Sequence, residues 1–355
     1  MFKENIILEL KEKIKKEPCN IENYKNLANY YIGSDDLDGA LLMYENILRI
    51  NPNDFQSLIN LGSIYFYKKM YPQSLQCYNK SIIIEPDNYA SYYNLGNIYA
   101  EIENFEQALK NYNKALELNP KKADIYTALG YLYQDVDNLQ TAKEYYKKAL
   151  EINPLDSEYN INIANIEQKQ GNHTQALNYY LKACESNKKD PKALLCAANT
   201  YSALKNFSKA QEYYKKTLEI APEYYPALVC CAIAYCDENK TVEAINRLKQ
   251  AIEIDPEKPN AYILLANIFL DEKRFDEALK IYKTVKILLP QNPKILTFIA
   301  NTYIMTNNYI QAVKYYKKAM KLAPKDNEIK LIYIETITQY IDNKMKGVKN
   351  ESQHN

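Results

Sequence analysis

Proline recurs along this 355-residue chain at a fixed spacing. Successive members of the series lie 34 residues apart, except for one interval of twice that length in which Lys188 takes the missing place. The series is Pro18, Pro52, Pro86, Pro120, Pro154, Pro222, Pro256, Pro290 and Pro324. A fixed period of roughly 20 to 50 residues is typical of stacked repeats, each of which packs mainly on its neighbours. If proline is position 32, nine complete repeats cover residues 21–326.

Small and aromatic residues hold fixed positions in these repeats. Position 8 is always Ala or Gly, and position 20 is Ala in every repeat except the second, which has Ser74. Position 24 is Tyr in eight repeats and position 11 is aromatic in eight. Small residues let two helices approach closely, and large side chains fill the space beside them. Asn or Asp near position 16 suits a helix N-cap, and proline ends the second helix.

This pattern resembles the tetratricopeptide repeat. The resemblance implies an all-α fold, a right-handed superhelical α-solenoid of helix-turn-helix repeats. We expect an N-terminal capping helix within residues 1–20, nine tandem repeats over 21–326, and a C-terminal capping helix at 327–341. Residues 342–355 have too little apolar content to pack and are predicted to be disordered.

Composition argues against several classes of partner. The net charge is +1, and only three of the 45 basic residues are arginine, so nucleic-acid binding is not expected. The longest apolar run, Ala227–Cys236, is about half of the roughly 20 residues that a membrane-spanning helix needs. The first residues lack the features of a secretory signal, and the seven cysteines suggest no disulfide framework. We therefore expect a cytoplasmic protein without a membrane span.

The sequence contains little material for catalysis. Its two histidines fall in a predicted turn and in the C-terminal tail, and the common nucleotide-binding, hydrolase and metalloprotease motifs are missing. Cys196, Cys230, Cys231 and Cys236 cluster in the sequence, but Cys231 is expected to point into the core. No enzymatic activity, cofactor or metal is predicted.

Asparagine is concentrated on one face of the predicted first helices. The family resemblance implies that positions 2, 5, 6, 9, 12 and 13 line a concave groove that binds peptides or protein segments. The chain has 39 Asn in 355 residues, so chance would put about two in the 18 slots of positions 6 and 9, whereas ten are there. They are Asn26, Asn60, Asn94 and Asn162 at position 6, and Asn29, Asn97, Asn165, Asn199, Asn267 and Asn301 at position 9.

Two interpretations of these amides stay open. An amide both donates and accepts hydrogen bonds, so a row of them could hold the backbone of an extended peptide. In this the row is similar to the repeat arm of O-linked N-acetylglucosamine transferases. Alternatively, the amides support contacts between helices.

The first two repeats and the seventh suggest more specific ligands. Lys25, Asn29 and Asn60 resemble part of the carboxylate clamp of co-chaperones, although Ala90 and Asn94 stand where that clamp has its next basic pair. In the seventh repeat the groove positions become apolar, with Val229, Cys230 and Ile233, which suggests an apolar anchor for a ligand.

The predicted function is therefore that of a non-catalytic scaffold or adaptor that binds a peptide or protein segment in its groove. One alternative is the targeting arm or subunit of a glycosyltransferase-type enzyme whose catalytic part is elsewhere. Another is a co-chaperone-like binder of acidic C-terminal peptides, and a third is self-association through the terminal helices, near Leu331 and Ile332. The sequence does not specify the partner's identity or the oligomeric state.

Overall fold

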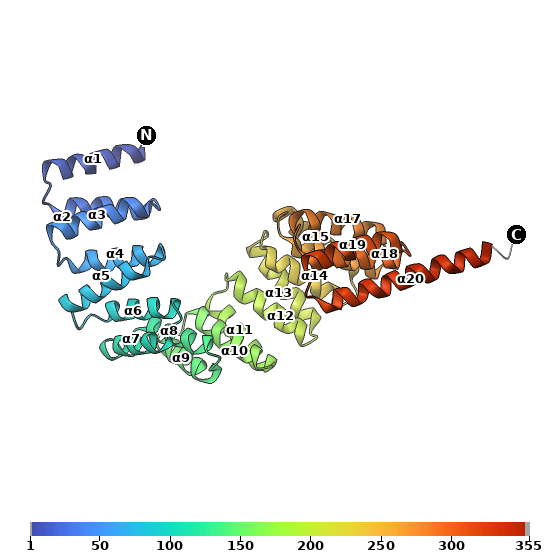
Figure 1. Ribbon diagram of the computed structural model, residues 1–355. Helices are drawn as coiled ribbons and strands as arrows, with labels where there is room; N and C mark the ends of the chain where they lie inside the picture. Colours follow the sequence, from blue (N-terminus) through green and yellow to red (C-terminus); the bar gives the residue numbers. More distant parts are fainter. Residues whose placement is uncertain (1, 352–355) are drawn as a thin grey trace. The chain divides into compact units, whose positions relative to one another are not determined.

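The computed structural model describes residues 2–351 and contains 20 helices within them, with no strand (Figure 1). The first helices of the nine repeats have 13 residues each: α2 (Ile21–Gly33), α4 (Phe55–Tyr67), α6 (Tyr89–Glu101), α8 (Ala123–Asp135), α10 (Ser157–Lys169), α12 (Pro191–Ala203), α14 (Tyr225–Asp237), α16 (Pro259–Asp271) and α18 (Pro293–Met305). The second helices have 14: α3 (Leu37–Ile50), α5 (Tyr71–Ile84), α7 (Phe105–Leu118), α9 (Leu139–Ile152), α11 (His173–Ser186), α13 (Phe207–Ile220), α15 (Thr241–Ile254), α17 (Phe275–Leu288) and α19 (Tyr309–Leu322). The two remaining helices are α1 (Phe2–Lys16) and α20 (Asn327–Glu351).

Corresponding helices begin 34 residues apart throughout, so the predicted all-α solenoid is confirmed. The chain forms two compact bodies, an N-terminal body with α1–α11 and a C-terminal body with α12–α20. Their boundary lies at Lys188, where the repeat lacks its proline. Within each body, a first helix packs on the second helix of its own repeat, and that second helix packs on the next first helix.

The turn between the two helices of each repeat has a fixed backbone. Position 15 is left-handed in every repeat, with φ of +79° at Gly171 and between +56° and +61° at the eight other residues, which are Asp, Asn, Glu or Lys. At position 16, Asn104, Asn138 and Asn206 accept a hydrogen bond from a backbone N–H of the following helix, which confirms the predicted N-caps. Asn172 makes no such cap, and its amide instead donates to Glu167.

The ends of the second helices do not depend on proline. Each second helix ends two residues before position 32. Proline disfavours helical backbone at the residue that precedes it, so a proline at position 32 suits this end. Yet α11 ends at the equivalent Ser186, although Lys188 replaces the proline, and its C-cap residue Asn187 is extended like Asn51 in the first repeat.

The core of each repeat is built around position 24. Seven of its eight tyrosines are among the largest fully buried side chains of the described chain: Tyr44, Tyr78, Tyr146, Tyr180, Tyr214, Tyr282 and Tyr316. Each ring needs a small residue at position 8. A Cβ added to Gly96 would lie 2.4 Å from the ring of Tyr112, and one added to Gly130 would lie equally close to Tyr146. The interpretation of these tyrosines as core residues is confirmed.

The terminal helices pack on the first and last repeats. Ile7, Leu10 and Ile14 of α1 contact the core of the first repeat. In α20, Ile329 is buried and lies in one cluster with Tyr316 of the ninth repeat. The sequence predicts that this helix ends at 341 and that disorder follows, but the structure continues the helix to Glu351.

The longer helix has a physical reason. Once a helix is nucleated by packing, each further residue adds a hydrogen bond and needs no apolar face. Residues 352–355 of the predicted tail lie outside the described part of the chain.

Two glycine substitutions should have opposite effects on stability. Gly96→Ala should lower the free energy of unfolding by about 1–3 kcal/mol because the new methyl group overlaps Tyr112. Gly33→Ala, with nothing within 4 Å of its Cβ, should raise it by up to about 1 kcal/mol. Urea denaturation followed by circular dichroism measures both changes, and stabilisation by Gly96→Ala would contradict the packing described above.

Alkali should unfold the protein between pH 10 and 12. Burial raises the pKa of Tyr78, Tyr282 and Tyr316 from 10.0 to about 12. The folded state then binds more protons than the unfolded state in this window, so stability is complete below pH 10 and is lost as the pH rises to 12. Tyrosinate absorbance and circular dichroism should change together. Ionisation of all tyrosines near pH 10 with intact helices would contradict this expectation.

Candidate functional site

Each asparagine at position 9 forms a hydrogen bond with the tyrosine at position 24 of its own repeat. The tyrosine hydroxyl donates to the asparagine Oδ1 in every case. The oxygen–oxygen distances are 3.5 Å for Tyr44–Asn29, 2.8 Å for Tyr112–Asn97, 2.6 Å for Tyr180–Asn165, 2.7 Å for Tyr214–Asn199 and 2.5 Å for Tyr282–Asn267, and Tyr316 donates to Asn301 in the same way. We call these six asparagines the asparagine row.

The repeats without Asn at position 9 explain why the row exists. In the second repeat, Ser63 bonds to Tyr78 at 2.8 Å. In the seventh, the tyrosine is replaced by Leu248 and the asparagine by Ile233, so both polar partners are lost together. In the fourth repeat, position 9 is Tyr131, and the hydroxyl of Tyr146 donates instead to Gln134 at position 12, at 3.4 Å. A buried hydroxyl needs a partner, and the residue at position 9 supplies it in seven repeats. The interpretation that these amides support helix contacts therefore holds for their oxygen atoms.

The asparagines at position 6 divide into two groups. Asn60 donates to the hydroxyl of Tyr44 at 2.9 Å, and Asn162 donates to Tyr131 at 3.0 Å, and each of these bonds joins consecutive repeats. Asn26 is exposed and Asn94 is half-buried, and neither makes a comparable bond within residues 2–351. The asparagine at position 6 therefore links consecutive repeats in some cases, and in others its amide makes no such bond among the described residues.

In several repeats, the side-chain nitrogen of the asparagine in the row has no hydrogen-bond acceptor among the described residues. The Nδ2 groups of Asn165, Asn267 and Asn301 have no acceptor among the residues that the structure describes, and Asn165 and Asn267 are exposed. At Asn199, Nδ2 lies 3.7 Å from the sulfur of Cys230. The tyrosine bond therefore fixes the orientation of each amide and leaves N–H donors on the surface of the first helices.

Lys25 already has a carboxylate partner. Its Nζ lies 3.2 Å from Oδ2 of Asp54, which also caps α4 through the backbone N–H of Ser57. Asn29 and Asn60 meet at one hydroxyl, that of Tyr44. The three residues proposed for a carboxylate clamp thus lie near one another, but internal bonds engage all of them.

The apolar positions of the seventh and eighth repeats mostly pack against each other. Val229, Ile263 and Leu264 contact one buried cluster, whereas Ile233 is 43% exposed. Burial raises the pKa of the Cys231 thiol to about 11, so it is protonated at neutral pH. No group of three potential metal ligands occurs in the described residues.

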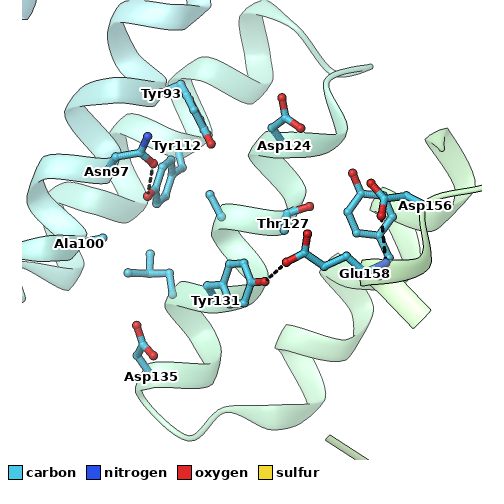
Figure 2. Close-up of a pocket in the computed structure, with 13 residues that line it drawn as sticks. Tyr93, Asn97, Ala100, Tyr112, Asp124, Thr127, Tyr131, Asp135, Asp156 and Glu158 are labelled. Atoms are coloured by element: carbon cyan, nitrogen blue, oxygen red, sulfur yellow. Dashed lines mark hydrogen bonds between the residues drawn. The ribbon is translucent and has the colours of Figure 1, made fainter. Parts of the chain in front are cut away.

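A cavity of about 340 Å³ opens on the first-helix surface of the third to fifth repeats (Figure 2). Figure 2 shows Tyr93 and Asn97 of α6 on one side, Asp156 and Glu158 on the other, and Thr127 and Tyr131 of α8 between them. Most lining residues of the three helices hold positions that the family resemblance assigns to the groove. We call this cavity the acidic pocket, because Asp124, Asp135, Asp156 and Glu158 line it.

Hydrogen bonds and one ion pair position three of these carboxylates. Oδ1 of Asp156 accepts from the backbone N–H of Glu158 at 2.9 Å and so caps α10. Oε1 of Glu158 accepts from the hydroxyl of Tyr131 at 2.9 Å. Asp124 pairs with Lys122 at 2.7 Å. The sequence analysis did not predict this pocket. The pattern that could have indicated it is the pair of acidic residues at positions 2 and 13 of the fourth repeat, Asp124 and Asp135.

Among the described helices, none has both the length and the apolar character required to cross a membrane.

A double-mutant cycle should reveal the bond within the row. Tyr282→Phe, Asn267→Ala and the double variant should show a coupling of about 1 kcal/mol in the free energy of unfolding, because each single change removes the same hydrogen bond. As a control, Tyr282→Phe combined with the remote Asn199→Ala should be additive. Urea denaturation measures both cycles, and equal coupling in the two would refute a specific bond.

Comparisons with known proteins identify the repeat. The family described as Cilia and flagella-associated protein 70 C-terminal domain matches residues 151–347, which is more than half of the chain. Families described as TPR repeat match residues 62–103 and 96–137, and one described as Tetratricopeptide repeat matches 123–154. A search of curated proteins finds no match.

Solved structures share the fold. A tetratricopeptide repeat protein from Parabacteroides merdae is 20% identical with a TM-score of 0.52, over 70% of this chain and 98% of that one. A structure from a functional characterisation of Pseudomonas aeruginosa pilF is 17% identical with a TM-score of 0.51, over 60% of this chain and 97% of that one. At these identities the likeness concerns the fold alone. The chain belongs to the tetratricopeptide repeat family and, through residues 151–347, to the family described as Cilia and flagella-associated protein 70 C-terminal domain.

Proposed function

We propose that the chain is a non-catalytic scaffold that binds an extended protein segment in a groove formed by the first helices within a body. The observation that carries this proposal is the asparagine row. Its amides are held by tyrosine hydroxyls on one side and offer N–H donors on the other, as at Asn165 and Asn267. A periodic set of donors suits the backbone carbonyls of an extended chain, which recur whatever the side chains are.

The tyrosine bond favours this binding energetically. A free asparagine side chain loses rotamer freedom when it binds, and this loss weakens association. In the row, the hydrogen bond from Tyr282 or Tyr316 has already restricted the amide. The ligand therefore meets donors whose orientation is set before it arrives.

An acidic C-terminal peptide is a poorer candidate for the same surface. Lys25 would be the cation that holds its carboxylates, but its Nζ is paired with Asp54 at 3.2 Å. Binding would have to displace a partner that also caps a helix. The ion pair therefore favours a ligand held through its backbone.

The test separates the amides from the bonds that hold them. A random displayed-peptide library is selected on the purified full chain, and the recovered peptides are titrated by fluorescence anisotropy. The triple variant Asn29→Ala, Asn97→Ala, Asn165→Ala should weaken binding at least about tenfold, because three donors are lost. Circular dichroism checks that helicity is unchanged.

The matched control is Tyr44→Phe, Tyr112→Phe, Tyr180→Phe. It removes the same internal bonds but keeps every amide, so it should weaken binding by less than about threefold. Equal losses in the two triple variants would attribute the effect to structure. Failure to recover any binding peptide would refute the proposed function.

A further inference from the structure

We propose that the acidic pocket binds an arginine side chain of the segment in the groove, an inference that rests on the proposed function. The lining of the pocket departs from the charge balance of the chain. The whole chain carries +1, yet four carboxylates line this cavity and its lining includes no basic residue. Lys122 pairs with Asp124 from the preceding loop, and no lysine or arginine contacts Asp135, Asp156 or Glu158 within the described residues.

The distribution of lysine strengthens the charge argument. The chain has 45 basic residues, but none at positions 2, 5, 6, 9, 12 or 13 of the third and fourth repeats. In the fourth repeat these positions are Asp124, Thr127, Ala128, Tyr131, Gln134 and Asp135. Lysine is therefore abundant on this chain but missing from the surface that lines the pocket. Apart from Lys122, which pairs with Asp124, a cationic ligand would meet attraction there without a competing cation.

The geometry suits a cationic side chain that reaches Tyr131 and Glu158. Asp124 lies in the first turn of α8 and Asp135 at its last residue, about 16 Å apart along the helix, so one guanidinium group can contact only one of these two. Tyr131 lies between them and is 39% exposed. Its hydroxyl holds Oε1 of Glu158, and the other carboxylate oxygen, Oε2, has no partner among the described residues. Figure 2 shows the Glu158 carboxylate directed toward Tyr131 across the cavity.

Aromatic and acidic groups together favour arginine over lysine. A guanidinium ion is planar and weakly hydrated, so it can stack on a tyrosine ring while it donates two hydrogen bonds to a carboxylate. Tyr93 and Tyr131 supply rings, and Glu158 and Asp135 supply carboxylates. A lysine ammonium is a compact, strongly hydrated charge and gains less from this arrangement. The cavity of about 340 Å³ is at the lower end for small-molecule sites, which suits one side chain of a peptide.

The experiment uses the peptides that the wild-type chain selects from the random library. We expect these peptides to be enriched in arginine. Each recovered peptide is then synthesised in two forms, with arginine or with citrulline, which keeps the shape and removes the charge. The arginine form should bind about tenfold more tightly or better, because a charge-assisted hydrogen bond is lost in the citrulline form.

The pocket variant is Asp135→Asn, Glu158→Gln. These residues cap no helix through their side chains, and glutamine keeps an oxygen that can accept from Tyr131. In this variant the preference for arginine over citrulline should fall below about threefold. The control Glu106→Gln, Glu151→Gln changes the net charge equally, on exposed positions of the second helices, and should keep the preference.

The outcomes distinguish this inference from the proposed function. Peptides that bind without arginine enrichment, or whose preference for arginine survives in the pocket variant, would overturn the inference and leave the scaffold function intact. Equal affinity for lysine and arginine forms would overturn the choice of arginine. The absence of any binding peptide would refute the scaffold function and this inference together.

Discussion

In eight of the nine repeats, the tyrosine at position 24 connects the interior of the repeat to its surface. Its ring fills the space that a small residue at position 8 leaves between two helices, so closely that a Cβ on Gly96 would overlap Tyr112. Its hydroxyl reaches the edge of the core, where it needs a hydrogen-bond partner. Position 9 of the first helix provides that partner in seven repeats, and Gln134 at position 12 provides it in the fourth. The packing of the core thus determines which residue appears on the surface and how its amide is oriented.

In the first repeat the same hydroxyl also links successive repeats. Tyr44 donates to Asn29 of its own repeat and accepts from Asn60 of the next. Repeats in a solenoid contact mainly their neighbours, so interfaces between them contribute directly to stability. A polar bond at this place adds orientation to an interface that is otherwise apolar. Surface chemistry on the first helices is therefore inseparable from the way in which the stack is held together.

The sequence predicted the period, the helix pairs and the buried tyrosines because each depends on local packing that recurs at fixed positions. It also placed the asparagine row on the first helices. It could not show that the amide oxygens face inward, because that depends on where a tyrosine hydroxyl from the second helix ends. Glu167, at a position that is aromatic elsewhere, illustrates the same limit: it is buried beside Lys143 at 3.0 Å and Asn172 at 2.9 Å. The burial of such a polar residue can be predicted only when its hydrogen-bond and ion-pair partners are known. The acidic pocket likewise needs three helices to bring its carboxylates together.

The seventh repeat shows that a helix pair can form without the bond between tyrosine and asparagine. There, Leu248 and Ile233 replace tyrosine and its polar partner, and the helix pair keeps the same length and spacing as the others. An apolar pair of suitable shape can replace a hydrogen-bonded pair at little cost in stability, since the net contribution of the bond is about 1 kcal/mol. Stability alone therefore does not require an amide at position 9. Its presence in six repeats supports a role for the remaining N–H donors outside the fold, on the surface where a ligand would lie.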